Sequence, residues 1–245
     1  MAHTKEQVLE RFAERLEAAL GDDLVAAVLY GSAARGTWTE GRSDLNVLIV
    51  VRDASAAALR PVTGVIADWV KTGEPPPLVF SEAEWRASTD VFPIEIEDMR
   101  EAHRRLRGQD VFAGLKTRRA DLRQELEREV RGKLLRLRTE YAAAAGDGKD
   151  LGRLLLATSS TFFALMRAAL RLAGRTPPVE PAALVQDAAA VAGMDAGAFD
   201  WVVARVLGRA MPPLEPHDPV AARYVDAIER LARFVDETPV SGGGE

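Results

Sequence analysis

The spacing of apolar residues changes near residue 114, and this change limits the folds that the chain can adopt. Before it, apolar residues gather in short runs rich in β-branched side chains, which are typical of buried strands. These runs lie at residues 25–30, 45–51 and 78–80. After it, apolar residues recur every three to four positions, which indicates amphipathic helices. The sequence therefore predicts an α+β fold, with a small mixed-sheet domain at 1–114, an all-α helical bundle at 115–238 and a flexible tail at 239–245.

Helix starts in the first part are marked by capping boxes, in which a Ser or Thr and a Glu or Gln three residues later cap each other's backbone. The two pairs are Thr4 with Gln7 and Ser81 with Glu84. The first helix should end at Gly21, and another helix is expected over 55–72, its start delayed by Pro61. Helices thus alternate with the predicted strands.

Residues 91–96 are interpreted as a further strand. Pro93 places this strand near a sheet edge, because proline cannot donate a hydrogen bond to a neighbouring strand. On such a strand Glu95 and Glu97 would share one face.

The second part of the chain is predicted to be nearly all helical. A long amphipathic helix is expected over 115–141. The helix at 151–172 is apolar around much of its circumference, so it should form the centre of a bundle. Two more helices, at 199–207 and 220–234, are expected to flank it.

Composition excludes several classes of site and predicts a location. Because the chain has no cysteine, disulfides, thiolate metal sites and cysteine nucleophiles are impossible, and its three histidines make zinc chemistry an unfavoured interpretation. One of them, His103, is expected in a solvated role on a charged helix over 100–105. The N-terminus lacks an apolar signal core, and no uninterrupted apolar run is long enough to span a membrane. A cytoplasmic location without membrane contact is therefore expected.

The net charge of −5 is unevenly distributed, and residues 98–140 are locally basic. Such a stretch can face phosphate or an acidic partner. Acidic residues are interspersed through it, however. We therefore favour a solvated helix face with ion pairs four residues apart, such as Glu127 with Arg131.

A turn-rich stretch after the first predicted strand carries the most specific pattern in the sequence. Gly31 and Ser32 directly follow the apolar run. Glycine lets the backbone turn sharply and approach a ligand closely. A serine at the start of a helix offers a hydroxyl and an N–H beside the positive end of the helix dipole. This pattern predicts a seat for a triphosphate.

Asp44 and Asn46 begin the next strand, twelve residues after Ser32. Side chains separated by one residue on a strand point to the same side, roughly 7 Å apart along the chain. Carboxylates in such positions can hold Mg²⁺ against phosphates, where it aligns an attacking hydroxyl and neutralises a leaving pyrophosphate. A third carboxylate on a neighbouring strand would complete the site, with Glu95 the first candidate and Glu97 the second.

The strand ending in Gly31-Ser32 and the strand start at Asp44 resemble the nucleotidyltransferase superfamily related to DNA polymerase beta. That superfamily includes the minimal nucleotidyltransferases and the antibiotic adenylyltransferases, and the resemblance covers roughly residues 25–100. It implies Mg²⁺-assisted transfer of a nucleoside monophosphate, with AMP favoured, from a nucleoside triphosphate such as ATP to a hydroxyl on a small-molecule or macromolecular acceptor. The family has Asp-x-Asp where this chain has Asp44-x-Asn46, so one charged ligand is missing.

The resemblance assigns roles to individual residues. The predicted catalytic residues are Asp44 and Glu95. The predicted metal ligands are Asp44, Asn46, Glu95 and Glu97. The predicted nucleotide-binding residues are Gly31, Ser32, Arg35 and Arg42. Each has a structural alternative: the aspartate can cap a turn, the glutamates can form the wet face of an edge strand, and loop arginines are often solvated.

Two hypotheses for the function remain open from the sequence. The chain is either an enzyme with a weakened Mg²⁺ site, or an inactive relative that keeps the fold and binds a nucleotide or a protein partner. A third hypothesis, an antitoxin that modifies or masks a ribonuclease toxin, is disfavoured because those antitoxins tend to be short single domains. The sequence leaves open whether the chain forms a homodimer.

Overall fold

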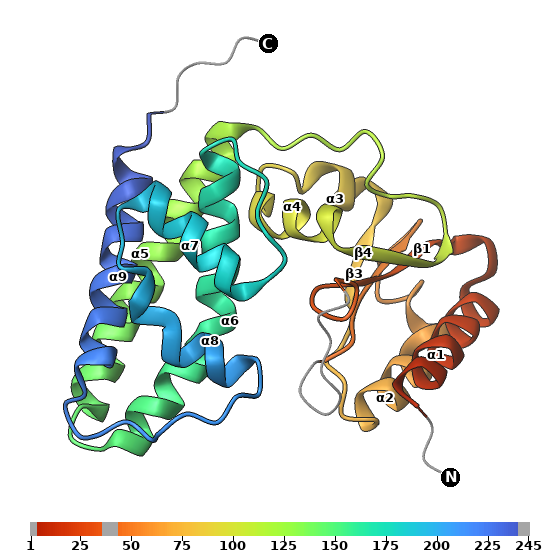
Figure 1. The fold of residues 1–245 in the computed structure, drawn as a ribbon. Coiled ribbons are helices and arrows are strands. Elements are labelled where there is room, and N and C mark those ends of the chain that lie inside the picture. Colours follow the sequence, from red (N-terminus) through yellow and green to blue (C-terminus); the bar gives the residue numbers. More distant parts are fainter. Residues whose placement is uncertain (1–3, 36–43, 240–245) are drawn as a thin grey trace. The chain divides into compact units, whose positions relative to one another are not determined.

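The computed structural model describes residues 4–35 and 44–239. The chain divides into two compact units, unit 1 at Met1–Thr117 and unit 2 at Arg118–Glu245 (Figure 1). Unit 1 holds a mixed sheet with helices, and unit 2 is helical, which confirms the predicted α+β fold class. Pro239 is the last described residue, so most of the tail predicted at 239–245 lies outside the described residues.

Unit 1 is built on a four-stranded sheet in the order β3-β2-β1-β4. The strands are β1 (Leu24–Tyr30), β2 (Asn46–Val51), β3 (Leu78–Ser81) and β4 (His103–Gly108). β1 is antiparallel to both β2 and β4, whereas β2 is parallel to β3. In the β1–β2 register Tyr30 lies opposite Asn46, which brings the end of β1 to the start of β2.

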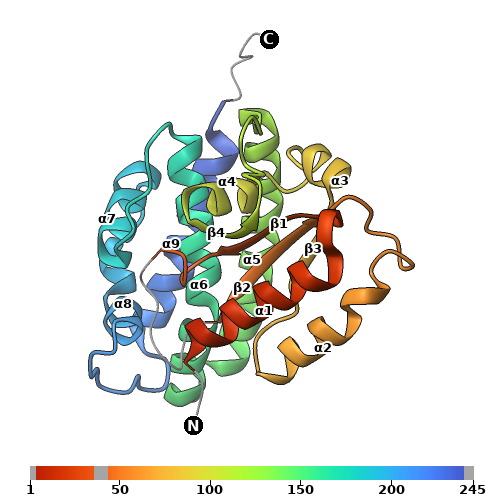
Figure 2. The ribbon, with the colours of Figure 1, turned by 90° about the vertical axis from the view of Figure 1, so that its right-hand side faces the viewer.

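Helices cover both faces of this sheet, as Figures 1 and 2 show. They are α1 (Lys5–Leu20), α2 (Thr63–Lys71), α3 (Glu82–Ala87) and α4 (Pro93–Glu101). On one face, Phe12 of α1 and Trp69 of α2 join Val47 in an apolar core. On the other, Trp85 of α3 and Ile96 of α4 pack against the strands. Because both faces are buried, the strands appear in the sequence as continuous apolar runs.

Local capping signals place the helix ends as predicted. Both capping boxes are present, Thr4 with Gln7 and Ser81 with Glu84. α1 ends at Gly21, whose φ of 52° favours glycine. A 3-10 turn at Arg60–Val62 contains Pro61, and α2 begins only after it. The helix predicted over 55–72 is therefore shorter than expected, with the delayed start that proline imposes.

The interpretation of residues 91–96 as a strand is wrong, because α4 begins at Pro93. Proline is favoured at the first helical position, where its missing N–H would have no partner and its fixed φ suits the helix. Ile96 and Met99, three residues apart, are both buried against the sheet. The helical spacing of these two residues therefore outweighs the alternation that suggested a strand.

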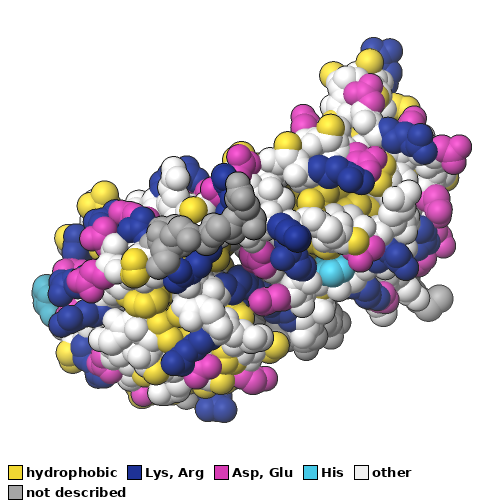
Figure 3. All heavy atoms as spheres, turned by 90° about the horizontal axis from the view of Figure 1, so that it is seen from above, with side chains coloured by type: hydrophobic (Ala, Val, Ile, Leu, Met, Phe, Trp, Pro, Cys, Tyr) yellow, Lys and Arg dark blue, Asp and Glu magenta, His cyan; other side chains and the backbone are white. Residues whose placement is uncertain are grey.

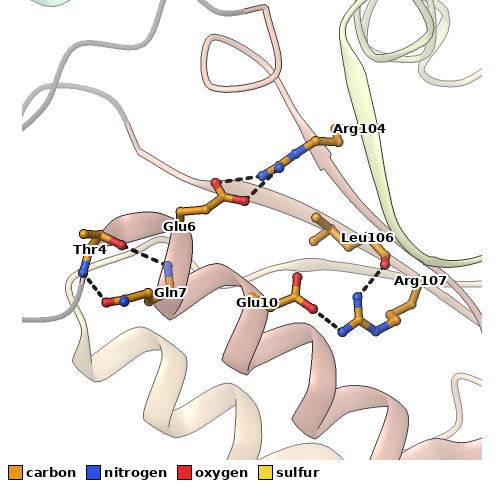
Figure 4. Close-up of polar contacts among 7 residues, drawn as sticks. All are labelled: Thr4, Glu6, Gln7, Glu10, Arg104, Leu106 and Arg107. Atoms are coloured by element: carbon orange, nitrogen blue, oxygen red, sulfur yellow. Dashed lines mark hydrogen bonds and ion pairs between the residues drawn. The ribbon is translucent and has the colours of Figure 1, made fainter.

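The helix predicted over 100–105 is wrong from His103 onward, where β4 pairs with β1. Arginines of this strand reach acidic residues of α1, far away in sequence. Figure 4 shows two of these contacts, Arg104 with Glu6 and Arg107 with Glu10. The hydrogen bond from Arg104 holds the pKa of Glu6 below its ordinary value. Ion pairs between distant segments thus fasten α1 to the edge of the sheet.

Unit 2 is helical in its described residues. Its helices are α5 (Arg119–Ala144), α6 (Gly148–Leu172), α7 (Pro181–Ala192), α8 (Asp200–Val206) and α9 (Pro219–Glu237), with a 3-10 turn at Ala196–Phe199. α6 contacts α5, α7, α8 and α9, so the predicted central helix is confirmed. α7 was not predicted from the sequence, because it is rich in alanine and carries few large apolar side chains.

α6 is long and apolar enough to cross a membrane by length and composition, and it alone among the described helices meets both criteria. More than half of its most apolar window is buried in the structure. Leu155, Phe162 and Met166 belong to its buried side. The central helix of a helical bundle satisfies the same criteria, and α6 occupies that position.

The basic stretch after residue 98 contains the ion pairs that its pattern predicted. Arg131 Nε lies 3.1 Å from Glu127 Oε1 on α5, and Arg131 Nη2 lies 2.9 Å from Asp236 Oδ1 on α9. Acidic and basic side chains are interspersed over the face drawn in Figure 3. The two ion pairs of Arg131 favour a solvated, internally paired surface for α5.

Two helical glycines of unit 2 provide a matched test of its packing. A β-carbon on Gly148 would lie only 1.7 Å from the Leu214 carbonyl oxygen, whereas one on Gly132 would meet nothing within 4 Å. We expect Gly148→Ala to lower the free energy of unfolding by about 1–3 kcal/mol through overpacking. Gly132→Ala should raise it by about 0.5–1 kcal/mol, because alanine loses less conformational entropy in a helix. Urea denaturation followed by circular dichroism measures both, and equal effects would contradict this packing.

Candidate functional site

The predicted phosphate seat lies where β1 ends. Gly31 has a φ of 81°, which is open to glycine but strained for other residues. Its N–H donates to the Ala102 carbonyl oxygen at 3.3 Å, while its own carbonyl accepts the N–H groups of Ala34 and Arg35. Ser32 stands in the turn that these bonds close. The backbone therefore reverses sharply at the position that the sequence indicated.

Asn46 lies beside this turn. A β-carbon built on Gly31 would lie 3.4 Å from Asn46 Nδ2, so the amide of Asn46 lies next to the Gly31 backbone. Tyr30 lies opposite Asn46 in the sheet, and Gly31 follows Tyr30 directly, so the turn begins close to Asn46. The structure thus brings together two predicted site residues, Gly31 and Asn46.

Asp44 and Asn46 flank a residue of the core. Leu45 is buried, Asp44 is exposed and Asn46 is half-buried. This alternation is what an extended chain produces when successive side chains point to opposite sides. Asp44 and Asn46 therefore project away from the core that holds Leu45. Asn46 shares its face with Leu48, which packs in the core on the α3 and α4 side of the sheet.

Glu95 approaches the same end of the sheet, although from a helix and not from the predicted strand. It lies in the first turn of α4 and is exposed. Burial raises the pKa of Tyr30, and the charge of Glu95 raises it further. Glu95 is therefore close to Tyr30, and Tyr30 lies next to Asn46 in the sheet.

Glu97 has a different environment from Glu95. Residues two apart on an α-helix point about 200° apart, so the prediction that these glutamates share one face is wrong. Glu97 Oε1 accepts a hydrogen bond from Arg100 Nη1 at 3.0 Å and another from the hydroxyl of Thr117. Glu97 thus fastens the segment after β4 to α4.

Asp44 and Asn46 are the predicted metal donors at the start of β2. Within residues 4–35 and 44–239, no group of three or more Asp, Glu or His side chains is placed to hold a metal ion. Asp44 offers a carboxylate, and Asn46 offers an amide oxygen. Mg²⁺ in nucleotide sites often takes only one or two protein ligands and completes its shell with phosphates and water. These two donors fit one such ion.

Arg35, predicted to bind the nucleotide, is held by α4. Its Nη2 lies 2.7 Å from Asp98 Oδ2 and donates to the Asp98 carbonyl oxygen at 3.1 Å. The side chains of Arg35 and Asp98 are only 10% and 20% exposed, so most of this pair is out of water. It ties the Gly31 turn to α4. Arg42, the other predicted phosphate contact, lies outside the described residues.

The structure also shows a residue that sequence reasoning missed, Glu74. It is 6% exposed, and its Oε2 accepts the Leu45 N–H at 2.7 Å. Its Oε1 lies 2.8 Å from Lys5 Nζ. The sequence showed Glu74 only as the residue before three prolines that end a helix. No local pattern connects it with a segment 29 residues away.

His103 also differs from its prediction. It begins β4, opposite Tyr30, and its Nδ1 lies 3.1 Å from the Met99 oxygen and 3.0 Å from the Arg100 oxygen. Its ring lies 4.4 Å from that of Phe112. His103 is therefore packed between a helix end and the core, and it is not a solvated residue of a helix.

Comparisons with known proteins agree with this fold. Residues 6–111 match a family described as "Nucleotidyltransferase domain". A search of curated proteins found no match. Among solved structures, the chain is similar to spectinomycin adenyltransferase AAD(9) from Enterococcus faecialis, crystallised with ATP and spectinomycin. The identity is 15%, the TM-score is 0.58, and the match covers 96% of this chain and 100% of that one. At this identity the structural likeness shows the fold.

The Arg35–Asp98 pair yields a test of how the turn is held. We expect Arg35→Met to lower the free energy of unfolding of unit 1 by about 1.5–3 kcal/mol, because it removes charged hydrogen bonds from a mostly buried carboxylate. Arg15→Met is the matched control, since Arg15 pairs with Asp68 on the surface and should matter much less. Chemical denaturation of both variants measures the difference. Equal losses would mean that Arg35 does not anchor the turn.

Proposed function

We propose that the chain transfers a nucleoside monophosphate to a hydroxyl acceptor, and the match of residues 6–111 to a family described as "Nucleotidyltransferase domain" supports this proposal. We assign AMP as the transferred group, ATP as its donor and Mg²⁺ as the metal. The observation that carries this proposal is the approach of Gly31 to Asn46 at the ends of β1 and β2. This approach supports the proposal because Asn46, one of the two predicted metal donors, lies beside a sharp backbone turn.

Different residues at this end of the sheet are proposed to bind the phosphates and the Mg²⁺ ion. Gly31 lets phosphate approach the backbone, and Ser32 offers its hydroxyl and N–H. Asp44 and Asn46 would hold Mg²⁺, which when bound neutralises charge on the departing pyrophosphate. Asn46 contributes an amide oxygen without a charge, so the metal is held more weakly than by two carboxylates. Arg42 is proposed as a further phosphate contact.

Glu95 is the proposed proton acceptor. It is exposed, it lies on α4, and its charge reaches Tyr30, the residue that pairs with Asn46. A carboxylate in hydrogen-bond reach of the acceptor hydroxyl can take its proton as the oxygen attacks the α-phosphate. Glu97 is not assigned this role, because Arg100 and Thr117 occupy its oxygen.

The acceptor that we propose is a hydroxylated small molecule. The similar structure holds ATP and spectinomycin. A small acceptor of that kind, with several hydroxyl groups, is therefore the class to test first.

An inactive nucleotide-binding relative is the second candidate. It is favoured by the neutral Asn46 and by the lack of a cluster of three acidic side chains within the described residues. Loss of a charged ligand weakens metal-dependent phosphoryl transfer far more than it weakens backbone contacts to phosphate. Such a protein would bind ATP without turning it over.

Two measurements on the purified chain separate the active enzyme from the inactive relative. The first is a titration with ATP, with and without Mg²⁺, and the second is an assay of pyrophosphate release. We expect Mg²⁺-dependent ATP binding, and pyrophosphate release when a hydroxylated acceptor such as spectinomycin is present. Asp44→Asn should abolish release, because it removes the one charged donor of the pair. Binding without release for a broad acceptor panel would favour the inactive relative. Absence of any ATP binding would refute both.

The variant Asn46→Asp tests the weakened metal site directly. The exchange adds a charge with almost no change in size, so Mg²⁺ should bind at least about tenfold more tightly, because one added charge at metal distance is worth well over 1.4 kcal/mol even at an effective dielectric constant of about 20. Pyrophosphate release should rise in parallel. Calorimetric Mg²⁺ titration measures the first effect, and Asn46→Ala, which offers no oxygen, is the control.

A thermal melt of Asn46→Asp shows whether the exchange changes the stability of the fold and not the metal site. If the Asn46 amide holds the fold by donating a hydrogen bond, the new carboxylate cannot donate, and stability should fall by about 1–3 kcal/mol. Unchanged Mg²⁺ affinity together with a lower melting temperature would refute the weakened-site proposal.

A further inference from the structure

Glu74 is a buried acid, unlike the other acidic residues in the part of the chain that the structure describes. Removing a carboxylate from water costs several kcal/mol unless a cation and hydrogen-bond donors compensate for it. The burial of the Glu74 carboxylate therefore calls for a structural or functional explanation. Its neighbours along the chain supply none, since three prolines follow it and lead into β3.

The two oxygens of Glu74 join two segments that are distant in sequence. Oε1 lies 2.8 Å from the ammonium of Lys5, the first residue of α1. Oε2 accepts the N–H of Leu45 at 2.7 Å. The segment that carries Glu74 is itself fixed, because the Trp69 indole donates to the Pro75 carbonyl oxygen at 2.7 Å. Glu74 is therefore a firm anchor and not a mobile surface side chain.

The anchored N–H belongs to the residue between the two proposed metal donors. β2 begins at Asn46, so the Leu45 N–H lies just before the sheet ladder, and the Glu74 carboxylate accepts it. A hydrogen bond to a charged acceptor is roughly twice as strong as a neutral one. It restrains the backbone at the point where the directions of Asp44 and Asn46 are set.

We propose that Glu74 is a positioning residue, which fixes the Leu45 backbone so that Asp44 and Asn46 present their oxygens to one Mg²⁺–ATP complex. This inference rests on the proposed function of the site. Glu74 acts through Leu45 and does not itself touch metal or nucleotide, because both of its oxygens are engaged elsewhere.

Glu84 provides a matched control. Its carboxylate also accepts a backbone N–H, that of Ser81, at 2.8 Å, but it does so at the start of α3. Glu74→Ala and Glu84→Ala therefore each remove one carboxylate that caps one N–H. Glu74→Gln is the conservative variant, because its amide oxygen can still accept the Leu45 N–H.

The experiment measures two quantities on the full chain: hydrogen exchange at the Leu45 amide, and calorimetric affinity for ATP in Mg²⁺. In Glu74→Ala we expect Leu45 exchange to rise and the affinity to fall, each by about tenfold or more, as loss of a hydrogen bond to a charged group implies. Glu74→Gln should recover most of both. Glu84→Ala should change neither.

A double-variant cycle shows whether Glu74 acts through the metal donors. In an Asp44→Ala background, Glu74→Ala should have little further effect on ATP affinity, because residues that act as one unit are not additive. Full additivity would overturn the proposal, as would normal affinity in a folded Glu74→Ala chain. If Glu74→Ala does not fold, Glu74→Met, which keeps the apolar stem of the side chain but offers no oxygen to the Leu45 N–H, takes its place, and normal ATP affinity in that variant would overturn the proposal.

Failure of the proposed function gives a different pattern. A wild-type chain that does not bind ATP refutes the function whatever its variants do. Leu45 exchange still decides the anchoring in that case: unchanged exchange in folded Glu74→Ala overturns it, and faster exchange than in Glu84→Ala supports it.

Discussion

The antiparallel pairing of β1 with β2 is the interaction on which the candidate site depends. Both faces of these strands are buried, so a slip of one residue would turn every apolar side chain to the opposite face. The core thereby fixes the register in which Tyr30 lies opposite Asn46. Gly31 follows and comes beside the Asn46 amide. The approach of turn and metal donor is thus set by apolar packing, at a distance from the polar groups themselves.

Several acidic side chains of unit 1 that lie near this end of the sheet or anchor its segments are committed to cations. The pairs are Lys5–Glu74, Arg35–Asp98 and Arg100–Glu97. They hold α1, the turn and α4 in place, but each carboxylate is neutralised by its partner and adds little attraction for Mg²⁺. Asp44 is exposed, and Asn46 is neutral. In the proposed site, Asp44 is therefore the charged donor for Mg²⁺, and Asn46 supplies a neutral amide oxygen.

Sequence reasoning succeeded where the determining contacts are local. Capping boxes and the glycine end of α1 act within one helical turn, and the apolar runs of β1 and β2 report burial directly. It failed at α4, where Ile94 and Ile96 fit a strand and only Pro93 signals a helix start. It also failed for Glu74, whose role depends on α1 and β2 meeting in three dimensions. The sequence predicted where the Gly31 turn and Asn46 lie in the chain. It did not predict which acidic side chains around them form ion pairs.

Nucleotide binding and nucleotidyl transfer make different demands on this site. Phosphate can be held by the Gly31 turn and Ser32 through backbone and hydroxyl groups, whose dipoles do not depend on residue 46. Transfer also needs charge neutralised on the leaving pyrophosphate, and in the proposed site this depends on the metal that Asp44 and Asn46 would hold. The two proposed functions therefore differ in how strongly one side chain, that of Asn46, supports a metal. In such a site the position of the Asp44 carboxylate matters most, because it is the only charged donor of the pair. If its backbone shifts, the neutral Asn46 amide cannot make up for the lost attraction to the metal.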